Sequence, residues 1–401
     1  MKRMLWGALG LLAFCTGPAA AAQQVLIDTA ANLALPQWKV TSADWARGGP
    51  AWSVVFRTLH GGRQEGVQVI EVDNGAMRFT IVPTRGFSLW KAQAGKLRLG
   101  WNSPVGEIVH PSYARLSDNG GQGWVAGFGA LMARGGLASF GAPTQDGNQQ
   151  LTLHGHVDYL PASFVSVRYD ALPSPRLVFR GIVNDTQTFG AQLRLTSEIS
   201  TPIGRAEVSF DDVISNLSDV PQEMELLYHT NFGTPLLGAG AEFVAPVKSV
   251  APMNQASGED MKSWNRYSGP HPAGYSAKVF NMELQTDSAG MTQAMLRAPD
   301  GNQGVLMRFD TKGLPYMSLW KNEVSAGSGY VTGLEPGTGY PNTRPWERRA
   351  GRVPVLKSGE SRRVHLTIAA LTSRAGVDQA AAEIKTLTRA APKILSKPTG
   401  P

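Results

Sequence analysis

Two histidines and one glutamate lie in sequence contexts that suit proton-transfer chemistry. His154 lies in the sequence LHG, His229 in YHTNFG and Glu335 in GLEPGT, and in each case a strand-like run meets a turn. Side chains at such junctions project into the mouth of a sheet, where a small ligand can reach them. An imidazole and a carboxylate with tuned pKa values can remove one proton and supply another, as the opening of a cyclic hemiacetal requires. These three residues are therefore the candidate acid, base and binding groups.

A metal site is the competing interpretation of His154. His156 follows two residues later and would share its sheet face if the strand continued, and such a pair can ligate a metal. No further cluster of ligand residues lies near this pair in the sequence, and Cys15 is the only cysteine of the chain. We therefore expect no metal and no other cofactor.

Aromatic and cationic side chains would complete a sugar site. Sugar rings stack on indoles, but tryptophan also fills protein cores, so we expect one tryptophan of several at the site. Arg85 or Arg134 near the pocket would favour an acidic sugar, since guanidinium groups pair bidentately with carboxylates. The candidate tryptophans are Trp101, Trp124, Trp264 and Trp320.

The elements that must position these residues are predicted to be strands. The chain has 401 residues, of which 42% are hydrophobic and 17% charged, and can bury a large core. Its 45 glycines and 26 prolines imply many turns, which favours numerous strands over a helical bundle. The sequence DNG at residues 73–75 predicts a hairpin between two β-branched runs, because Asn-Gly tolerates positive φ. We therefore expect an all-β protein.

Strand patterns recur at intervals of about ten residues, a spacing typical of a large antiparallel sandwich. Residues 101–147 are rich in glycine and contain several prolines, and we interpret them as loops, a common location of functional residues. A C-terminal helix is predicted over residues 375–390. The predicted strands are residues 52–57, 66–72, 76–82, 87–92, 150–153, 162–169, 176–183, 192–200, 205–215, 223–228, 241–245, 277–284, 292–297, 304–310, 316–320, 329–335 and 361–371.

The N-terminus has the pattern of an export signal. Two basic residues precede an apolar run, which is followed by a Gly-Pro break and small residues up to Ala22. Cleavage after Ala22 would place the mature protein in the periplasm or outside the cell. Lipid attachment at Cys15 is the alternative, which the bulky Phe14 disfavours.

Four segments follow from these patterns. They are a signal peptide at residues 1–22, an irregular leader at 23–50, a β-sandwich domain at 51–372, and a C-terminal helix with a basic tail at 373–401. No stretch reaches the roughly 18–20 apolar residues that a membrane span needs. The formal charge of +7 falls by two to +5 when the signal is lost, and Lys and Arg are scattered, so we expect no nucleic-acid partner. The oligomeric state stays open.

The candidate residues resemble those of the galactose mutarotase-like superfamily. Three elements occur in a fixed order in that superfamily: Leu-His-Gly, then a second His element, then a Glu followed by Pro and Asn. His154, His229 and Glu335 occur in the same order here. Other sequences are similar to a subfamily of aldose 1-epimerase-like proteins long catalogued as a domain of unknown function, and the resemblance covers roughly residues 50–372. These sequences are DNG at 73–75, PTRG at 83–86, LGWNSPVG at 99–106, HP at 110–111 and WKN at 320–322.

The resemblance implies a large antiparallel β-supersandwich and a role for each residue. Glu335 would be the general base on the anomeric hydroxyl and His229 the general acid on the ring oxygen, while His154 would hold or polarise a hydroxyl. Arg85 would orient the sugar, with Arg134 as its competitor for that role. The other substrate-binding residues expected from the matched sequences are Asn231, Trp320 and Asn322.

Some residues depart from the superfamily pattern. Thr230 and Gly233 replace the usual neighbours of the second histidine, and no residue matches the sugar-binding aspartate. His60, in LHGG, resembles the first histidine element locally, but it precedes Arg85, against the superfamily order. We interpret His60 as a hairpin residue.

The sequence therefore predicts an exported aldose 1-epimerase-like enzyme that acts on a free sugar or a sugar derivative. A non-catalytic carbohydrate-binding protein on the same fold is the second hypothesis, since a fold does not establish an activity. Retention of both histidines and Glu335 favours the enzyme. A polysaccharide lyase or glycoside hydrolase is the third hypothesis, but glycoside hydrolysis uses two carboxylates and only one stands out here.

Overall fold

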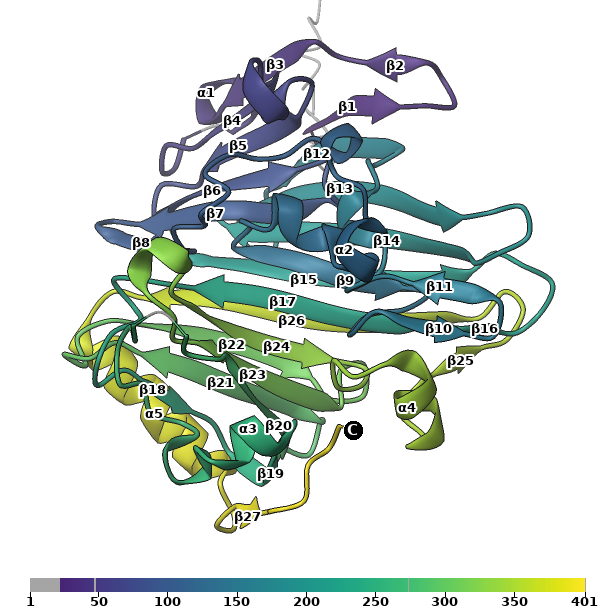
Figure 1. Cartoon of the computed structure of the whole chain (residues 1–401). Helices are drawn as coiled ribbons and strands as arrows, with labels where there is room; N and C mark the ends of the chain where they lie inside the picture. The colour runs from purple at the N-terminus through teal and green to yellow at the C-terminus, as the bar shows by residue number, and fades with distance from the viewer. Residues whose placement is uncertain (1–21, 47, 273, 401) are drawn as a thin grey trace, which may run out of the picture.

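Two large sheets, antiparallel except for the short strand β27, stack on each other and make up most of the protein (Figure 1). The computed structural model describes residues 22–46, 48–272 and 274–400. In spatial order, the ten-stranded sheet contains β18 (Glu242–Val244), β21 (Met291–Arg297), β22 (Gly304–Asp310), β26 (Ser361–Leu371), β15 (Glu207–Asn216), β14 (Gln192–Pro202), β13 (Arg176–Thr186), β12 (Phe164–Asp170), β1 (Ala22–Asp28) and β2 (Leu33–Ala34).

The second sheet has thirteen strands and carries the candidate residues. β8 (Leu97–Leu99) pairs with β7 beside the main path of this sheet. The other strands, in spatial order, are β27 (Lys393–Ile394), β19 (Val247–Pro252), β20 (Lys278–Leu284), β23 (Tyr316–Asn322), β24 (Val331–Gly337), β17 (Glu225–Phe232), β9 (Met132–Leu137), β7 (Ser88–Ala94), β6 (Met77–Val82), β5 (Gln68–Asp73), β4 (Ser53–Thr58) and β3 (Gln37–Thr41).

Short helices and two small two-stranded ladders flank the two sheets. No helix in the described part of the chain is both long and apolar enough to cross a membrane. The short ladders are β10 (Thr144–Asp146) with β11 (Gln149–Leu151), and β16 (Gln222–Glu223) with β25 (Val355–Leu356). The α-helices are α1 (Ser42–Trp45), α2 (Asp118–Gly121), α3 (Gln255–Gly258), α4 (Arg344–Arg349) and α5 (Arg374–Leu387).

Alternating side chains build the core between the sheets. In β14 every second residue from Leu193 to Thr201 is buried, as expected for a strand with one face towards the core. Phe79 of one sheet meets Phe179 of the other edge to face, with ring centroids 6.2 Å apart. On the far side of the ten-stranded sheet, α5 packs its apolar stripe on strands β21 and β22.

The predicted all-β fold and its short C-terminal helix are confirmed. The hairpin at residues 73–75 joins β5 to β6, with Gly75 at a φ of 90°. The interpretation of residues 23–50 as an irregular leader is wrong, because β1 pairs with β12 and β3 pairs with β4, so this segment adds edge strands to both sheets. The C-terminal tail also joins a sheet, since β27 pairs with β19. The signal peptide lies outside the described residues, apart from Ala22.

One irregular segment covers the centre of the thirteen-stranded sheet. Residues 100–131, here named the cover segment, connect β8 to β9 and include α2. Strands β9, β17 and β24 are buried on both faces, so they contact the core on one side and covering segments on the other. The interpretation of residues 101–147 as loops missed β9, because the glycines within MARGGL resemble a loop, and it also missed the three-residue strand β10. The predicted strand over residues 150–153 overlaps β11.

Candidate active site

His229 and Glu335 face each other across two neighbouring strands. The antiparallel register of β17 and β24 pairs Thr230 with Leu334, which sets His229 opposite Glu335. On β17, Tyr228 points into the core and donates a hydrogen bond to Asp212 of the other sheet, so His229 points to the opposite face, beneath the cover segment. The Nε2 atom of His229 lies 3.2 Å from Oε1 of Glu335. Two residues 106 positions apart in sequence thus form one buried pair.

Asn231 fixes the orientation and tautomer of the His229 ring. The Asn231 amide nitrogen donates to the carbonyls of Ala130 and His229, both at 3.1 Å, so its oxygen is the acceptor. That oxygen lies 2.8 Å from Nδ1 of His229, which therefore carries the proton and donates it. In the neutral ring, Nε2 is left with a free lone pair directed to the side of Glu335.

Gly333 provides the space for the Glu335 carboxyl group. The two residues share a face of β24, and a Cβ atom at position 333 would lie only 2.2 Å from Oε1 of Glu335. The backbone at Gly333 does not adopt a positive φ, so the glycine is needed for space and not for conformation. Sequence reasoning missed this residue, although its spacing of two from Glu335 is visible in the sequence.

His154 reaches the pair from a turn after β11. Its ring centroid lies 5.2 Å from that of His229. The residue has a φ of 55°, which is unusual for a side chain other than glycine, and its backbone hydrogen-bonds Gly141 and Gly136 on either side. Gly155 follows with a φ of 68°, and a Cβ atom there would lie 2.1 Å from the carbonyl oxygen of Ser139. The LHG sequence therefore forms a tight turn that directs His154 towards His229.

Aromatic rings enclose the three residues. Trp124 and Phe128 of the cover segment lie 5.6 and 5.0 Å from the His229 ring, between centroids, and Trp320 of β23 lies 5.3 Å from it. Trp101 packs on Phe128 at 4.9 Å. Trp124 and Trp320 therefore contact the His229 ring directly, and Trp101 lies behind Phe128 in the same aromatic cluster. The fourth candidate tryptophan, Trp264, packs instead on Phe243.

Several polar atoms in this enclosure are buried without a hydrogen-bond partner among the described residues. A buried donor or acceptor left unpaired costs about 1–3 kcal/mol, so such a cluster is rare without a ligand or water to satisfy it. The Glu335 oxygen belongs to this set although it lies 3.2 Å from Nε2 of His229, because that nitrogen carries no proton in the tautomer fixed by Asn231. The atoms are Nε1 of Trp101, Nε1 of Trp124, Nδ1 of His154 and Oε1 of Glu335.

Burial controls the charges of the three central residues. Loss of solvent raises the pKa of Glu335 to about 8 and lowers the pKa of His229 to about 4, the latter partly opposed by the hydrogen bond to Asn231. Burial and the neighbouring His229 hold the pKa of His154 well below 6.5. Near pH 7 the pair therefore contains one proton on the carboxyl group and one free imidazole lone pair. One donor and one acceptor thus lie side by side.

Arg85 lies behind the aromatic enclosure. Its guanidinium group donates to the carbonyls of Asp158, Val109 and Gly127 and forms an ion pair with the Asp158 carboxylate. It also lies 3.9 Å from the centre of the Tyr159 ring, whose hydroxyl donates to the carbonyl of Trp124 at 2.6 Å. Arg85 therefore anchors the cover segment. A direct contact with sugar stays a prediction that this position does not favour.

Arg134 lies in the core and not at the site. It pairs with Asp212 at 2.7 Å, and its remaining N–H groups donate to Ser197 and to the carbonyls of Gly86 and Phe87. All five of its N–H groups are engaged within the protein. Neither candidate arginine presents a free guanidinium group to a substrate carboxylate.

The remaining predicted residues support the site or lie away from it. Asn322 donates to the carbonyl of Gly329 at 3.0 Å, in the turn beneath Trp101. His156 lies 3.9 Å from Asp185, which raises its pKa. His60 is largely exposed beside Glu65. Within the described residues, no group of three His, Cys, Asp or Glu side chains is arranged to hold a metal ion.

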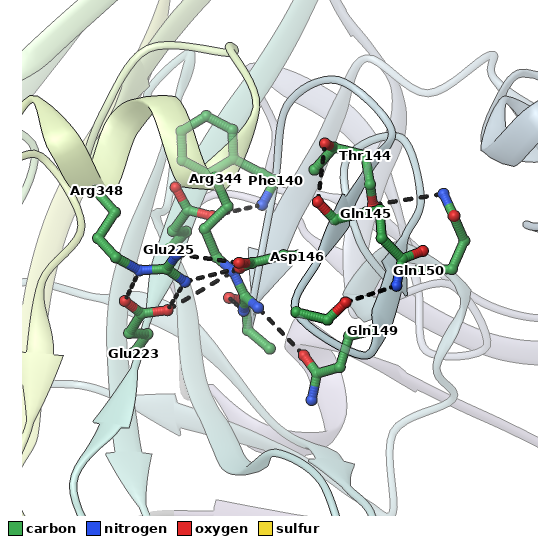
Figure 2. A network of polar contacts seen from close by, with 12 residues as sticks. Phe140, Thr144, Gln145, Asp146, Gln149, Gln150, Glu223, Glu225, Arg344 and Arg348 are labelled. Carbon is green, nitrogen blue, oxygen red and sulfur yellow. Dashed lines mark hydrogen bonds and ion pairs between the residues drawn. The ribbon is translucent and has the colours of Figure 1, made fainter.

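An ionic network fixes the hairpin that leads to His154 (Figure 2). Arg344 of α4 donates to Asp146 at 2.7 Å and to Gln149 at 3.1 Å, on either side of the turn of the β10–β11 hairpin. Arg348 also holds Asp146, at 2.7 Å, and continues to Glu223 at 2.5 Å. Because α4 follows β24, the network ties the hairpin before His154 to the chain that carries Glu335.

The sequence of residues 64–370 matches the family described as Domain of unknown function (DUF4432). A solved protein from Klebsiella pneumoniae, described as a candidate aldose 1-epimerase, is 33% identical with a TM-score of 0.92, over 94% of this chain and 99% of that chain. No curated protein matches the sequence.

Two more distant structures share the fold alone. A galactose mutarotase-like protein from Clostridium acetobutylicum has a TM-score of 0.56 at 12% identity, over 84% of this chain and 98% of that chain. A galactose mutarotase related enzyme from Lactobacillus acidophilus has a TM-score of 0.51 at 12% identity, over 76% and 98%. These matches confirm the resemblance seen in the sequence. The chain belongs to the DUF4432 family and has the fold of galactose mutarotase-like proteins.

Proposed function

We propose that the protein interconverts the anomers of a reducing sugar by general acid and base catalysis at His229 and Glu335. The observation that carries this proposal is the buried contact of 3.2 Å between His229 Nε2 and Glu335 Oε1, within an aromatic enclosure. A sugar ring bound against this contact would have both groups within reach, which proton transfer to its two oxygens requires.

The proton count of the pair suits a reversible ring opening. Ring opening starts once the shared proton has moved from Glu335 to His229. With Glu335 then as base and His229 as acid, opening moves one proton from the anomeric hydroxyl to the carboxylate and one from the imidazolium to the ring oxygen. The carboxyl group is then protonated and the imidazole neutral, which is the charge state that burial favours in the empty site. Rotation of the aldehyde group and reversal of both transfers give the other anomer. The pair keeps one shared proton and no net charge before and after ring opening.

The other polar atoms of the enclosure would hold the sugar hydroxyls. The indole N–H groups of Trp101 and Trp124 are donors, and the unpartnered Nδ1 of His154 can bind a hydroxyl. The rings exclude water, which strengthens these interactions and keeps the shifted pKa values. We also propose that the protein is exported, on the pattern of residues 1–22. N-terminal sequencing of the native protein checks the cleavage after Ala22.

Polarimetry tests the proposed activity. Freshly dissolved α-anomers of neutral and acidic sugars should reach equilibrium rotation faster with the protein than without it. His229→Asn and Glu335→Gln should each lose about 10² to 10⁴-fold of that acceleration. If no sugar of the panel is accelerated, the proposed activity is wrong.

A non-catalytic sugar-binding protein is the second candidate. The unpartnered donors of the enclosure favour this candidate as much as the enzyme, because they can bind sugar hydroxyls whether or not turnover follows. A two-carboxylate glycosidase is less well supported, since burial alone raises the pKa of Glu335 and no neighbouring carboxylate contributes. Tight binding without anomer exchange would favour the binding protein.

A further inference from the structure

A large cavity lies on the same face of the thirteen-stranded sheet as the candidate site. Its volume is about 830 Å³, and its floor is formed by β4, β5, β6 and β7, with β8 and the start of the cover segment as a wall. This volume is within the range of about 300–1,000 Å³ that ligand pockets occupy. None of the three central residues lines it, so the cavity is separate from the pair of His229 and Glu335.

The cavity reaches the aromatic enclosure at one end. Trp101 and Gly129 line the cavity, and Trp101 packs on Phe128, which in turn contacts the His229 ring. Ser103, another lining residue, donates a hydrogen bond to the carbonyl of Phe128 at 2.6 Å. The Nε1 atom of Trp101 is buried without a partner among the described residues. The cavity and the enclosure therefore share one wall.

The chemistry of the lining suits a neutral, hydroxyl-rich ligand. Three acidic and three basic side chains line the cavity, so it has no excess of charge that would select an anion or a cation. Carboxylate, guanidinium and amide groups can each bind neighbouring hydroxyls, and the indoles of Trp90 and Trp101 offer rings to stack on. The charged lining residues are Glu71, Asp73, Glu107, Arg78, Lys91 and Arg98.

We propose that this cavity binds the further sugar units of a reducing oligosaccharide whose terminal ring reacts between His229 and Glu335. The inference deepens the proposed function and rests on it for the position of the terminal ring. Only the reducing end of an oligosaccharide has a hemiacetal that can open. When this terminal ring is bound at the reactive site, all other units must therefore extend away from that site to one side. The cavity adjoins the enclosure at Trp101, on the same face of the sheet, and offers room for units that extend past this residue.

Filling the cavity tests the inference. Gln93 is an exposed residue of β7 in the lining, and Gln93→Trp would place an indole in the cavity. Gln37, an exposed glutamine of β3 outside the lining, provides the matched control Gln37→Trp. Arg78→Ala is the second variant. Loss of the exposed Arg78 guanidinium group removes a hydrogen-bonding group from the lining without filling the cavity.

Binding is measured by calorimetry in the full chain carrying Glu335→Gln, so that no turnover occurs. The probes are glucose and galactose, and the reducing oligosaccharides maltose, maltotriose, cellobiose, cellotriose and lactose. We expect at least one oligosaccharide to bind tenfold or more tightly than its monosaccharide. Gln93→Trp should remove that gain and Arg78→Ala should reduce it, while Gln37→Trp should retain it and monosaccharide affinity should not change.

The outcomes separate this inference from the proposed activity. Equal affinity for monosaccharides and oligosaccharides, or equal effects of Gln93→Trp and Gln37→Trp, would overturn the cavity assignment and leave a monosaccharide mutarotase. An oligosaccharide gain that depends on Gln93 and Arg78, in a protein whose wild type accelerates no anomer exchange, would support the cavity and end the proposed activity.

Discussion

Glu335→Gln should make the protein more stable at neutral pH while it removes catalysis. The Glu335 side chain is 3% exposed, and burial raises its pKa to about 8 from an ordinary value of 4.5. A carboxyl group with a raised folded pKa contributes its full stability below pH 4.5, and that stability is lost as the pH rises towards 8. Glutamine has a similar shape and no charge, so it removes this pH-dependent loss.

The magnitude follows from the shift. Each pKa unit corresponds to about 1.4 kcal/mol, so wild type should lose about 3 kcal/mol relative to Glu335→Gln between pH 4.5 and pH 7. The difference in unfolding free energy between the two proteins should level off at about 5 kcal/mol once the pH exceeds the folded pKa of about 8. These values are upper bounds, because a proton moved from Glu335 to His229 would stabilise the carboxylate as an ion pair.

Urea unfolding at pH 5, 6, 7 and 8, followed by tryptophan fluorescence, measures the difference between the two proteins. The exposed Glu259→Gln, whose side chain is 70% exposed, gives the baseline for losing a carboxyl group at the surface. A difference between wild type and Glu335→Gln that does not change from pH 5 to pH 8 would refute the argument. It would mean that Glu335 is already ionised in the folded protein.

Three further changes test how the pair is positioned. Gly333→Ala places a methyl group 2.2 Å from the Glu335 oxygen and should lower kcat by about 10² or more, with the fold intact by circular dichroism. Asn231→Asp puts a negative charge beside His229 and raises the pKa of His229. The pair then takes up a second, inhibitory proton at higher pH, so the acidic limb of the activity profile should move to higher pH. Arg344→Met frees the hairpin before His154 and should raise KM more than it lowers kcat, measured by initial rates.

Controls and contrary results are specific to each change. Gly327→Ala, in the connection that leads into β24 and with open space around it, should leave activity unchanged. Full activity in Gly333→Ala would mean that the carboxyl position is not critical. An unmoved acidic limb in Asn231→Asp would show that His229 does not set it. An unchanged KM in Arg344→Met would remove the ionic network from sugar binding.

The sequence predicted the architecture well where one face of a strand meets solvent. The strands of the ten-stranded sheet alternate in polarity, and the predicted strand over residues 192–200 matches β14 (Gln192–Pro202). β9 was missed because both of its faces are buried, so MARGGL lacks the alternation that marks a half-buried strand. Strands β1 and β3 were missed because turn-prone residues lie beside them in the segment 23–50.

The sequence also pointed to the central residues of the site, and the structure brings three of them together. His154, His229 and Glu335 converge because two neighbouring strands and one turn carry them. The local pattern did not show that Arg85 would be fully occupied by carbonyls and by Asp158, since those partners lie 24 to 73 residues away. Phe128 had no signal in the sequence, because its place depends on how the cover segment folds back.

Exchange NMR at equilibrium tests the central claim most directly. The rate at which the α and β anomeric proton signals of a sugar exchange is measured with catalytic amounts of wild type, Glu335→Gln and His229→Asn. We predict exchange well above the spontaneous rate with wild type, and a loss of about 10² to 10⁴-fold in each variant, while saturation-transfer signals show that Glu335→Gln still binds the sugar. A wild-type protein that binds the sugar and leaves its exchange rate at the spontaneous value would contradict the account.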